Sequence, residues 1–444
     1  MLERNRYVRI AAIAVAILTV SLYLHLLLYP AFQTQHVPRK HSRSVQPTTY
    51  SGRQPYDVRK IIDAFRQPHD DLVMLCAYRG LRWNGTAENP RDSYFRAAEA
   101  GIECIETDLQ LSKDNVLLMV HDDGVGRTTD VGERDGRPAY NPFTGQGHNP
   151  RVDQSRYTGD LETLHLRDEA GRVRVETIPT LADLIQMIHD TGINIVLQLD
   201  FKDKRAVEPA YWALKNLTNA AGVPANEWCI YKLQAAWYQT AAEFEALAWV
   251  KDAFSSGVRL AYIPVYEPED FGKWDQLAGV KSFLQTNYTI SIEIERRSSS
   301  WRLQDVFDHV KEGTDPQSVV TGTGVFFPGG DFIAPISSGR TFWDTSNYSL
   351  PEDARKNNSV FVFEENSKPQ LLDWLTGELS FDGHDYRQDF NWLMEQGYNW
   401  VIADNADSWS ESLSKQGKRN VSWMIMDGKK AIPDGVGRGW YQRK

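Results

Sequence analysis

Cysteine is scarce in this sequence, with three residues in a chain of 444: Cys76, Cys104 and Cys229. Three cysteines are too few for the multiple disulfides that hold small secreted domains together. Each of them stands in an apolar stretch, namely VMLCAY, GIECIE and EWCIYKL. The sequence therefore predicts buried thiols that fill the core.

An excess of positive charge is absent outside the first 60 residues. The chain has a net charge of −10, and residues 1–60 contain nine Lys and Arg against two acids, which leaves −17 for residues 61–444. Proteins that bind nucleic acid need a basic surface for the phosphate backbone. The acidic body therefore excludes nucleic acid as the main partner.

Long apolar runs are also rare, and the longest spans residues 10–28 with His25 as its one interruption. A bilayer-spanning helix needs roughly 20 apolar residues. The run predicts a transmembrane signal-anchor helix over residues 10–29, preceded by a short tail at 1–9. Two alternatives stay open: a cleaved signal peptide, whose apolar region is usually about 7–15 residues long, and a buried helix.

Arginine and lysine flank the apolar run equally on both sides, so charge does not decide its orientation. Glycosylation sequons give a second criterion, and they begin at Asn84, Asn216, Asn287, Asn347, Asn357 and Asn420. They favour a single-pass membrane protein whose body is lumenal or extracellular and carries glycans. Residues 30–65 are polar and basic and predict a flexible tether, and residues 411–444 predict a C-terminal extension.

Short β-rich runs alternate with helical stretches over residues 70–410. The runs span 72–78, 102–109, 193–201, 228–233, 259–266, 288–295, 359–364 and 399–404. Eight such units predict the α/β class and a (β/α)₈ TIM barrel. An open doubly wound sheet is the alternative, but no glycine-rich phosphate loop follows the first run.

Helix boundaries are marked by capping residues, and Thr180 is expected to cap the helix that starts at TLADLIQMIHDTG. Two stretches, 131–176 and 313–358, are too long for ordinary barrel connections. We expect them to be insertions that form lids or irregular segments.

Charged side chains follow the predicted strands at their carboxyl ends, where barrel enzymes carry their sites. The first strand ends in Tyr78-Arg79, and the next two end in Glu106-x-Asp108 and Asp200-x-Lys202. Side chains alternate along a strand, so both members of each x-separated pair point the same way. Charged pairs cannot face apolar helices cheaply, so we expect them at the barrel mouth, with His121 close by.

Three carboxylates at one mouth would repel one another. A hard cation such as Mg²⁺ or Ca²⁺ takes oxygen ligands and would resolve the repulsion, whereas the lack of a Cys/His cluster disfavours zinc. Structural ion pairs with Arg79, Arg127 and Lys202 are the alternative. By the same parity argument, Glu293 and Glu295 face the barrel interior, as pocket-lining residues or as part of a buried network.

The stretch from Leu75 to Asp130 resembles the glycerophosphodiester phosphodiesterase family. It reads AYRG, then AEN, then IETDLQLSKDNVLLMVHDDGVGRTTD, where that family carries H-R-G, P-E-N, E-x-D, H-D and R-T-T in this order. Further similarities follow in IPTLADLIQMI, LQLDFK, SVFVFEEN and GYNWVIADNAD. The resemblance extends from about residue 72 to residue 410, and SVFVFEEN corresponds to the family's seventh strand.

The resemblance implies a metal-dependent TIM barrel that cleaves phosphodiesters with Mg²⁺ or Ca²⁺. It places metal ligands at Glu106, Asp108 and Asp200 and a catalytic histidine at His121. It also implies substrate or phosphate contacts for a second group of residues, which comprises Arg79, Lys202, Glu88 and Asn89.

The sequence departs from the family at the first of its two catalytic histidines, where Tyr78 stands. Histidine titrates near pH 6.5 and tyrosine near pH 10, so a phenol is a poorer proton shuttle. Ala87 and Pro90 also replace the family's Pro and Thr. Three outcomes follow: Tyr78 acts as the acid, the hydrolase is impaired, or the barrel is a pseudoenzyme that keeps its metal or phosphate ligand.

The sequence thus predicts a hydrolase of glycerophosphodiesters or lysophospholipid-like substrates in lipid metabolism. An alternative is a phospholipase D-like lyase that forms a cyclic phosphate, because the Asp200-x-Lys202 pair is similar to that of the spider-venom relatives of the family. We expect a small phosphodiester or lysolipid as substrate and the membrane as a partner through the N-terminal helix. The sequence leaves the oligomeric state open.

Overall fold

The computed structural model describes residues 55–427, apart from 83–84, 141–145, 169–170, 296–302, 314–317, 328–332, 336–340, 344–389 and 405. The predicted transmembrane segment, most of the predicted tether and the sequons at Asn84, Asn347 and Asn357 lie outside these residues. Among the helices that are described, none combines the length and the apolar character needed to cross a bilayer.

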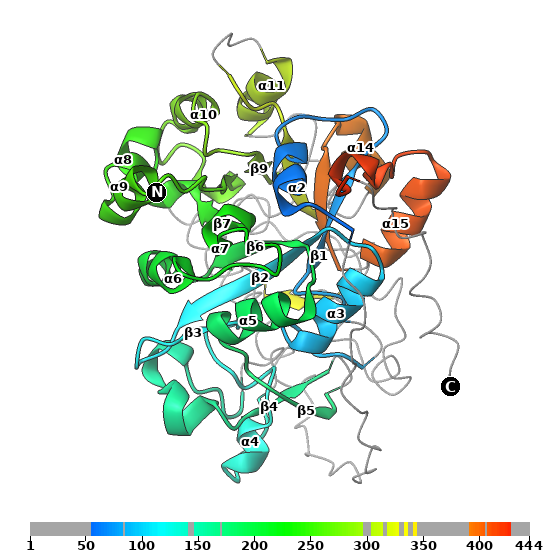
Figure 1. Cartoon of the computed structure of the whole chain (residues 1–444). Coiled ribbons are helices and arrows are strands. Elements are labelled where there is room, and N and C mark those ends of the chain that lie inside the picture. Colours follow the sequence, from blue (N-terminus) through cyan, green and yellow to red (C-terminus); the bar gives the residue numbers. More distant parts are fainter. Residues whose placement is uncertain are drawn as a thin grey trace, which may run out of the picture. The chain divides into compact units, whose positions relative to one another are not determined.

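Eight parallel strands form a closed barrel, as the alternation of strand and helix patterns predicts (Figure 1). They are β1 (Met74–Tyr78), β2 (Cys104–Leu111), β6 (Val196–Phe201), β7 (Cys229–Gln234), β8 (Tyr262–Tyr266), β9 (Ile292–Ile294), β10 (Thr323–Phe327) and β13 (Trp400–Ala403). Strand β1 pairs with β2 on one side and with β13 on the other, and this double pairing closes the barrel. The predicted TIM-barrel architecture is confirmed.

The seventh barrel strand is not where the sequence predicts it. Strand β10 fills the place between β9 and β13, and it lies inside the stretch 313–358 that we expect to be an insertion. Glycine lowers strand propensity. Gly322 and Gly324 therefore weaken the sequence pattern by which this strand could be predicted. Gly324 is required, because a Cβ atom there would overlap the ring of Trp400. The segment 359–364, predicted as the seventh strand, lies outside the described residues.

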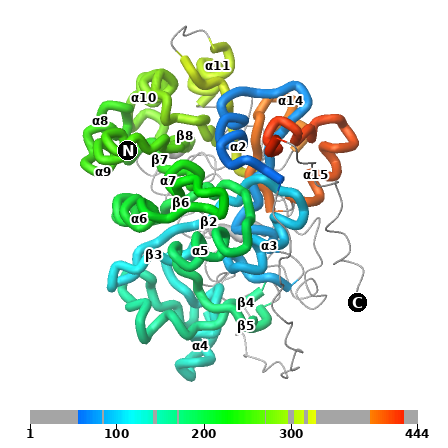
Figure 2. Tube along the Cα trace, viewed as in Figure 1, coloured from blue at the N-terminus to red at the C-terminus, as the bar shows by residue number. Residues whose placement is uncertain are grey.

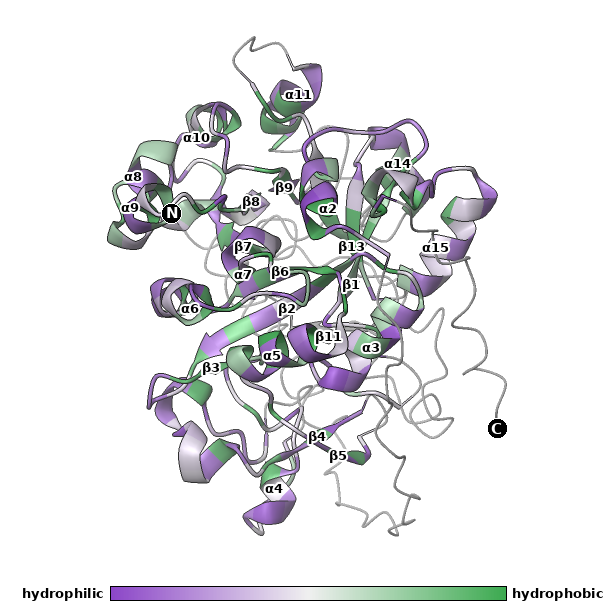
Figure 3. Cartoon of the chain, in the orientation of Figure 1, coloured by the Kyte–Doolittle hydropathy of each residue, from purple (hydrophilic) through white to green (hydrophobic). Residues whose placement is uncertain are grey.

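Helices surround the strands and turn their apolar sides toward them (Figure 3). They include α3 (Arg91–Glu99), α5 (Leu181–Thr191), α6 (Val207–Leu214), α7 (Ala225–Trp228), α8 (Ala241–Glu245), α9 (Ala248–Ser255), α10 (Gln276–Leu284), α11 (Gln304–Glu312), α14 (Phe390–Gln396) and α15 (Ala406–Lys415). The Thr180 side chain accepts a hydrogen bond from the Asp183 amide, which confirms the predicted N-cap of α5.

The first predicted insertion is a folded unit beside the barrel (Figure 2). It contains helix α4 (Val131–Arg134) and the antiparallel pair β4 (His165–Arg167) and β5 (Val173–Thr177). Val131, Val152, Leu161 and Leu166 belong to a small apolar cluster, separate from the barrel core, that also includes residues outside the predicted insertion such as Val125. The short strand β3 (Leu117–Leu118) extends β2 toward it.

The amino ends of the strands are covered by helix α2 (Val58–Ala64) together with residues near the C-terminus. The Asp57 amide donates to the Met424 carbonyl, and Met424 is fully buried. The buried pair Arg419–Glu103 joins the same segment to the start of β2. The predicted tether therefore ends before α2, and the first part of the predicted C-terminal extension packs against the barrel, because both segments carry apolar residues that the barrel buries.

Cys76 and Cys104 form a disulfide bond, so the prediction of a buried thiol is wrong for these two residues. They are register partners on neighbouring strands β1 and β2, with a Cα–Cα distance of 4.3 Å. Strand register brings them together, and the sequence spacing of 28 residues does not reveal it. Cys229 is a buried free thiol, as predicted.

Candidate active site

The carboxyl ends of four neighbouring strands bring the predicted site residues together. Tyr78 on β1 is the register partner of Glu106 on β2. Asp108 on β2 is the partner of Asp200 on β6, and Asp200 is the partner of Lys232 on β7. The disulfide lies one layer below, beneath Tyr78 and Glu106, as strand parity requires.

The backbone after β1 takes an unusual path that turns Arg79 into the site. Arg79 has a φ of 56° and Asn89 a φ of 63°, both in the left-handed region that side chains other than glycine seldom adopt. Gly80 follows with a φ of 79°, and a Cβ there would overlap Ser93. Backbone conformations of this kind concentrate at functional sites, where the surrounding structure holds them in place.

Glu106, Asp108 and Asp200 form a compact group of carboxylates. Each offers one oxygen, and these oxygens all lie within 4.8 Å of one another. The Asn89 amide donates to Oδ2 of Asp108 at 3.1 Å and accepts from the Thr107 hydroxyl at 2.8 Å, which fixes the orientation of Asp108. The structure therefore assembles the three predicted metal ligands in a geometry that one cation can share.

Positive side chains border this group on two sides. The Arg79 guanidinium lies 3.0 Å from Asp108, and the Lys202 ammonium lies 3.2 Å from Asp108 and 2.8 Å from Asp200. These contacts are the ion pairs that the sequence left as an alternative to metal. Burial raises the pKa of Asp200, but the charges of Lys202 and Lys232 outweigh burial and hold that pKa below its usual value.

Glu106 distinguishes the two alternatives, because it forms no ion pair with any described residue. It is almost completely buried. Burial, reinforced by the negative charge of Asp108, holds the pKa of Glu106 well above its ordinary value. A buried carboxylate next to two others and without a cationic partner suits a hard divalent cation, which prefers oxygen ligands.

His121 stands at the rim of the site and is held by its neighbour. Its Nδ1 lies 2.8 Å from Oδ1 of Asp122, and Arg127 binds the other Asp122 oxygen at 2.6 Å. The side-chain amide of Gln110 donates to the carbonyls of His121 and Asp122. Burial, together with the charges of Arg79 and Lys202, lowers the pKa of His121, so the imidazole is neutral at neutral pH.

Glu88 links the histidine side of the site to the arginine side. Arg127 binds it with two hydrogen bonds, of 2.7 and 3.0 Å, and Arg79 binds it at 2.9 Å. Burial raises the pKa of Glu88, but these guanidiniums outweigh burial and keep it below its usual range. Glu88 is therefore ionised and positions two arginines; the structure shows Arg127 bound to Glu88 and Asp122 rather than to the three-carboxylate group.

Tyr78 is buried at the position where the family resemblance places a histidine. Its ring packs 4.7 Å from Phe326 and its hydroxyl accepts a hydrogen bond from Arg79, whose guanidinium lies 4.2 Å from the ring centre. Burial, only partly offset by the Arg79 charge, holds the pKa of the phenol well above its ordinary value. The phenol is therefore neutral and a weak acid.

Three further ion pairs at this end of the barrel involve Lys232 and Arg82, which were not predicted as site residues. Lys232 on β7 lies 3.5 Å from Asp200 and 3.2 Å from Glu293, which confirms that Glu293 faces the interior. Arg82 binds the buried Asp404 at the end of β13. The signal for Lys232 was a lone charge within the apolar run 228–233.

The nine predicted site residues thus lie in one connected network at the barrel mouth. Residues 78–227, which carry all nine, match the model of the "Glycerophosphoryl diester phosphodiesterase family".

Individual relatives are more distant. A glycerophosphodiester phosphodiesterase from Caldanaerobacter subterraneus subsp. tengcongensis is 28% identical over 128 residues, which cover 29% of this chain and 45% of that protein. The match thus spans less than half the length of this relative.

The solved structures that this chain resembles have low sequence identity to it. A glycerophosphoryl diester phosphodiesterase from Parabacteroides distasonis has a TM-score of 0.47 at 14% identity, covering 86% of this chain and 96% of that one. A phosphodiesterase from Oleispira antarctica, solved in complex with the product sn-glycerol-3-phosphate, has a TM-score of 0.42 at 16% identity, covering 78% and 97%.

Proposed function

Because residues 78–227 match the glycerophosphoryl diester phosphodiesterase family, we propose that this protein is a metal-dependent phosphodiester hydrolase. Its substrates are glycerophosphodiesters or lysophospholipid-like molecules, and it acts in lipid metabolism. The observation that carries the proposal is the group Glu106, Asp108 and Asp200, whose oxygens lie within 4.8 Å of one another beside His121 and Lys202.

These three carboxylates would hold Mg²⁺ or Ca²⁺, since all their donors are oxygen atoms. A bound divalent cation polarises phosphoryl oxygens and neutralises the charge that develops on them. Asn89 keeps Asp108 in a fixed orientation for this role. Glu106 is buried and forms no ion pair with a described residue, and burial with the charge of Asp108 raises its pKa although Lys232 and Lys202 oppose the shift, so a bound cation would stabilise its ionised form.

Arg79 and Lys202 orient the substrate phosphate. Both side chains carry fixed positive charge, and burial with Asp108 as a shared partner restricts their movement. Glu88 keeps Arg79 in place through a buried ion pair. A planar guanidinium and a point-charge ammonium together suit the oxygens of a phosphodiester.

His121 moves the proton. Because Nδ1 is hydrogen-bonded to Asp122, Nε2 is the nitrogen that takes up or releases a proton during ester cleavage. Asp122 stabilises the imidazolium that forms. The lowered pKa of His121 keeps the imidazole in its basic form at neutral pH.

Tyr78 stands where the family resemblance places the other proton-transferring histidine, and a phenol transfers protons poorly at neutral pH. The loss of one acid–base group costs about 10²- to 10⁴-fold in rate, and burial makes this phenol a weaker acid than free tyrosine. We therefore propose a slow hydrolase. The rival function is a barrel that binds a metal or phosphate ligand without turnover, and the buried position of Tyr78 is the observation that favours it.

We further propose that the body is lumenal or extracellular and is held at a membrane by residues 10–29. The Cys76–Cys104 disulfide supports an oxidising compartment, and the sequon residues Asn216, Asn287 and Asn420 are exposed. Glycosidase treatment of protein from its native source should increase its gel mobility. Unchanged mobility would remove the support that the sequons give.

The decisive experiment measures metal binding and metal-dependent release of glycerol 3-phosphate from glycerophosphodiesters by the purified full-length protein. Glu106→Gln should weaken Mg²⁺ or Ca²⁺ binding in calorimetry and reduce release by at least about 10²-fold, since the cation supplies charge stabilisation. Tyr78→His should raise the rate, because it restores a group that titrates near neutral pH.

A matched control removes a carboxylate of similar size that does not belong to the site. Asp123 follows Asp122 directly, is exposed and pairs with Arg151, so Asp123→Asn should leave metal affinity unchanged. If Glu106→Gln leaves metal affinity unchanged as well, the ligand assignment is wrong. If neither the wild type nor Tyr78→His releases product, the protein is a ligand-binding barrel without turnover.

A further inference from the structure

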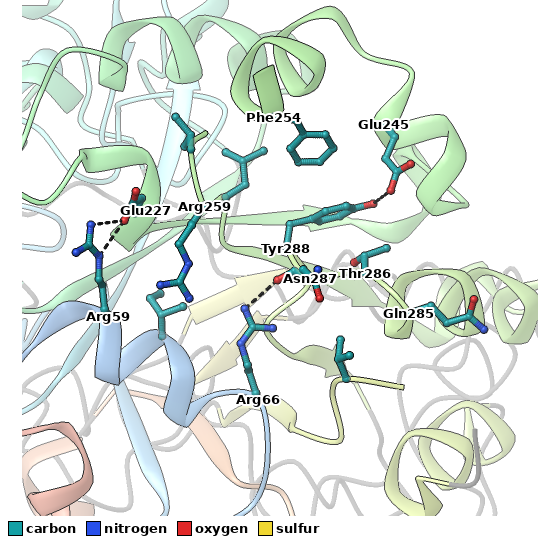
Figure 4. Close-up of a pocket in the computed structure, with 14 residues that line it drawn as sticks. Arg59, Arg66, Glu227, Glu245, Phe254, Arg259, Gln285, Thr286, Asn287 and Tyr288 are labelled. Carbon is teal, nitrogen blue, oxygen red and sulfur yellow. Dashed lines mark hydrogen bonds and ion pairs between the residues drawn. The ribbon is translucent and has the colours of Figure 1, made fainter. Parts of the chain in front are cut away.

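Figure 4 shows the side chains that line a cavity. The cavity has a volume of about 790 Å³ and lies at the opposite end of the barrel from the carboxylate group. It is formed by helix α2 and by the segments that lead into β7, β8, β9 and β10, so it opens at the amino ends of the strands. Its volume is in the range of pockets that enclose small organic ligands, about 300–1,000 Å³. The proposed hydrolase activity makes no use of it.

Three arginines gather along one side of this cavity: Arg59, Arg66 and Arg259. Arg66 is held in place by the carbonyls of Asn287 and Thr289, at 2.9 and 3.0 Å. These carbonyl acceptors are neutral, and the described carboxylate within ion-pair distance of Arg66 is Asp63, at 3.6 Å.

Carboxylates do not balance this side of the cavity. Asp63 is shared, because it also lies 3.7 Å from Arg259. Glu227 receives two hydrogen bonds from Arg59 on a single oxygen, at 2.9 and 3.0 Å. On this side three guanidiniums share Asp63 and Glu227 as ion-pair partners, and Glu245, the other carboxylate that lines the cavity, accepts from Tyr288 instead. The Arg259 side chain remains 61% exposed.

The other side of the cavity is apolar and aromatic. The ring of Tyr288 packs 5.4 Å from that of Phe254, and the Tyr288 hydroxyl donates to Glu245 at 3.1 Å. Phe254 and Val319 are among the large apolar side chains that remain exposed. Figure 4 shows these rings opposite the arginines, so one wall attracts an anion and the other buries an apolar ring.

We propose that this cavity binds a small organic anion. The acidic group, a phosphate, sulfonate or carboxylate, contacts the three arginines, because guanidiniums bind such groups with paired hydrogen bonds. The ring-containing body lies against Phe254 and Tyr288. An anion without an apolar body would fill one half of the cavity, and a neutral aromatic would fill the other half.

The test titrates the full-length protein with 2-naphthalenesulfonate in isothermal titration calorimetry, in EDTA so that no divalent cation is present. We expect one saturable site. The neutral analogue 2-naphthalenemethanol should bind at least about ten-fold more weakly, because a hydrogen bond to a charged group contributes about 1.5–3 kcal/mol. The same argument predicts that Arg259→Gln weakens sulfonate binding about ten-fold.

Val319 supplies a matched pair of variants, since its side chain is 47% exposed and can be replaced without disturbing the core. Val319→Glu adds a negative charge at the cavity wall and should weaken 2-naphthalenesulfonate binding about five-fold, by roughly 1 kcal/mol of repulsion. Val319→Gln adds the same atoms without the charge and should stay within about two-fold of the wild type.

The proposal is overturned if 2-naphthalenesulfonate shows no saturable binding, or if the neutral analogue binds equally well. Equal affinity of the wild type, Arg259→Gln and Val319→Glu would also overturn it, because the anion would then bind elsewhere. Thermal unfolding of each variant, measured without ligand, shows whether the fold is kept.

Discussion

Arginine side chains lie at both ends of the barrel, and Arg79 and Arg82 at the active site are far more buried than Arg59 and Arg259 at the cavity. At the carboxyl ends of the strands, Arg79 and Arg82 are 3% and 9% exposed and are bound to buried carboxylates. At the amino ends, Arg59 and Arg259 are 48% and 61% exposed beside a cavity. A buried guanidinium has lost its hydration and depends on its partners. An exposed one keeps its water and can exchange it for a ligand.

The same substitution at both ends tests this contrast and has the largest expected effect on stability. Arg82→Gln leaves Asp404 buried without its charged partner. Breaking a buried pair in this way costs about 3–5 kcal/mol. Arg259→Gln changes an exposed side chain and should stay within about 0.5 kcal/mol of the wild type. Denaturant unfolding measures both, and equal losses would contradict the contrast.

Below the ion pairs of the active site, the Cys76–Cys104 disulfide joins β1 to β2. Removing the disulfide with Cys76→Ala/Cys104→Ala should lower the free energy of unfolding by about 3.5 kcal/mol, given a sequence separation of 28 residues. Cys229→Ala is the control, because that thiol is buried but unbonded.

Thiol labelling provides an independent reading of the same bond. The denatured, unreduced protein should react with iodoacetamide at one cysteine and at three after reduction. Three reactive thiols without reduction would show that Cys76 and Cys104 are not joined.

The pH dependence of stability gives a smaller effect at the mouth. Burial raises the pKa of Glu293 to about 7, although Lys232 opposes the shift. An unfolded glutamate titrates near pH 4.3, so the folded protein binds this proton more tightly than the unfolded chain does. The stability it contributes is complete below about pH 4.3 and is lost as the pH rises through about 7.

Glu293→Gln removes this titration and keeps a polar side chain of the same size. Between about pH 4.5 and 7.5 the wild type should therefore lose on the order of 3 kcal/mol more than the variant. Urea unfolding in EDTA at several pH values measures the difference. Parallel curves for the two proteins would mean that Glu293 titrates normally.

The alternation of side chains along a strand correctly predicted which charged residues face the barrel mouth, because this alternation is a property of each single strand. Glu106 with Asp108, and Asp200 with Lys202, could face only the interior, since outer helices cannot accommodate charge. The structure brings these four residues together at the ends of β2 and β6. Their catalytic and metal-binding roles stay predictions until the ligand and activity experiments are done.

The disulfide, strand β10 and the cavity at the amino ends were not predicted, because each depends on how several segments pack together. The register between β1 and β2 pairs Cys76 with Cys104, and no local pattern encodes it. Strand β10 contains glycine because Trp400 packs over it, which weakened its strand signal. The cavity at the amino ends arises where α2 meets the segments leading into four strands. Such a hollow depends on how these segments pack together.

The closing pair of the barrel sets the order in which the chain completes its fold during synthesis. Met74 in β1 is the register partner of Trp400 in β13. One edge of β1 therefore stays unpaired until more than three hundred further residues have been synthesised. One edge of strand β10 also stays unpaired until β13 has been synthesised, because the two strands pair. Unpaired strand edges of this kind invite wrong partners in unfinished chains. A ribosome-bound chain that lacks β13 therefore has an open sheet, and the mouth is complete only after synthesis has passed Ala403.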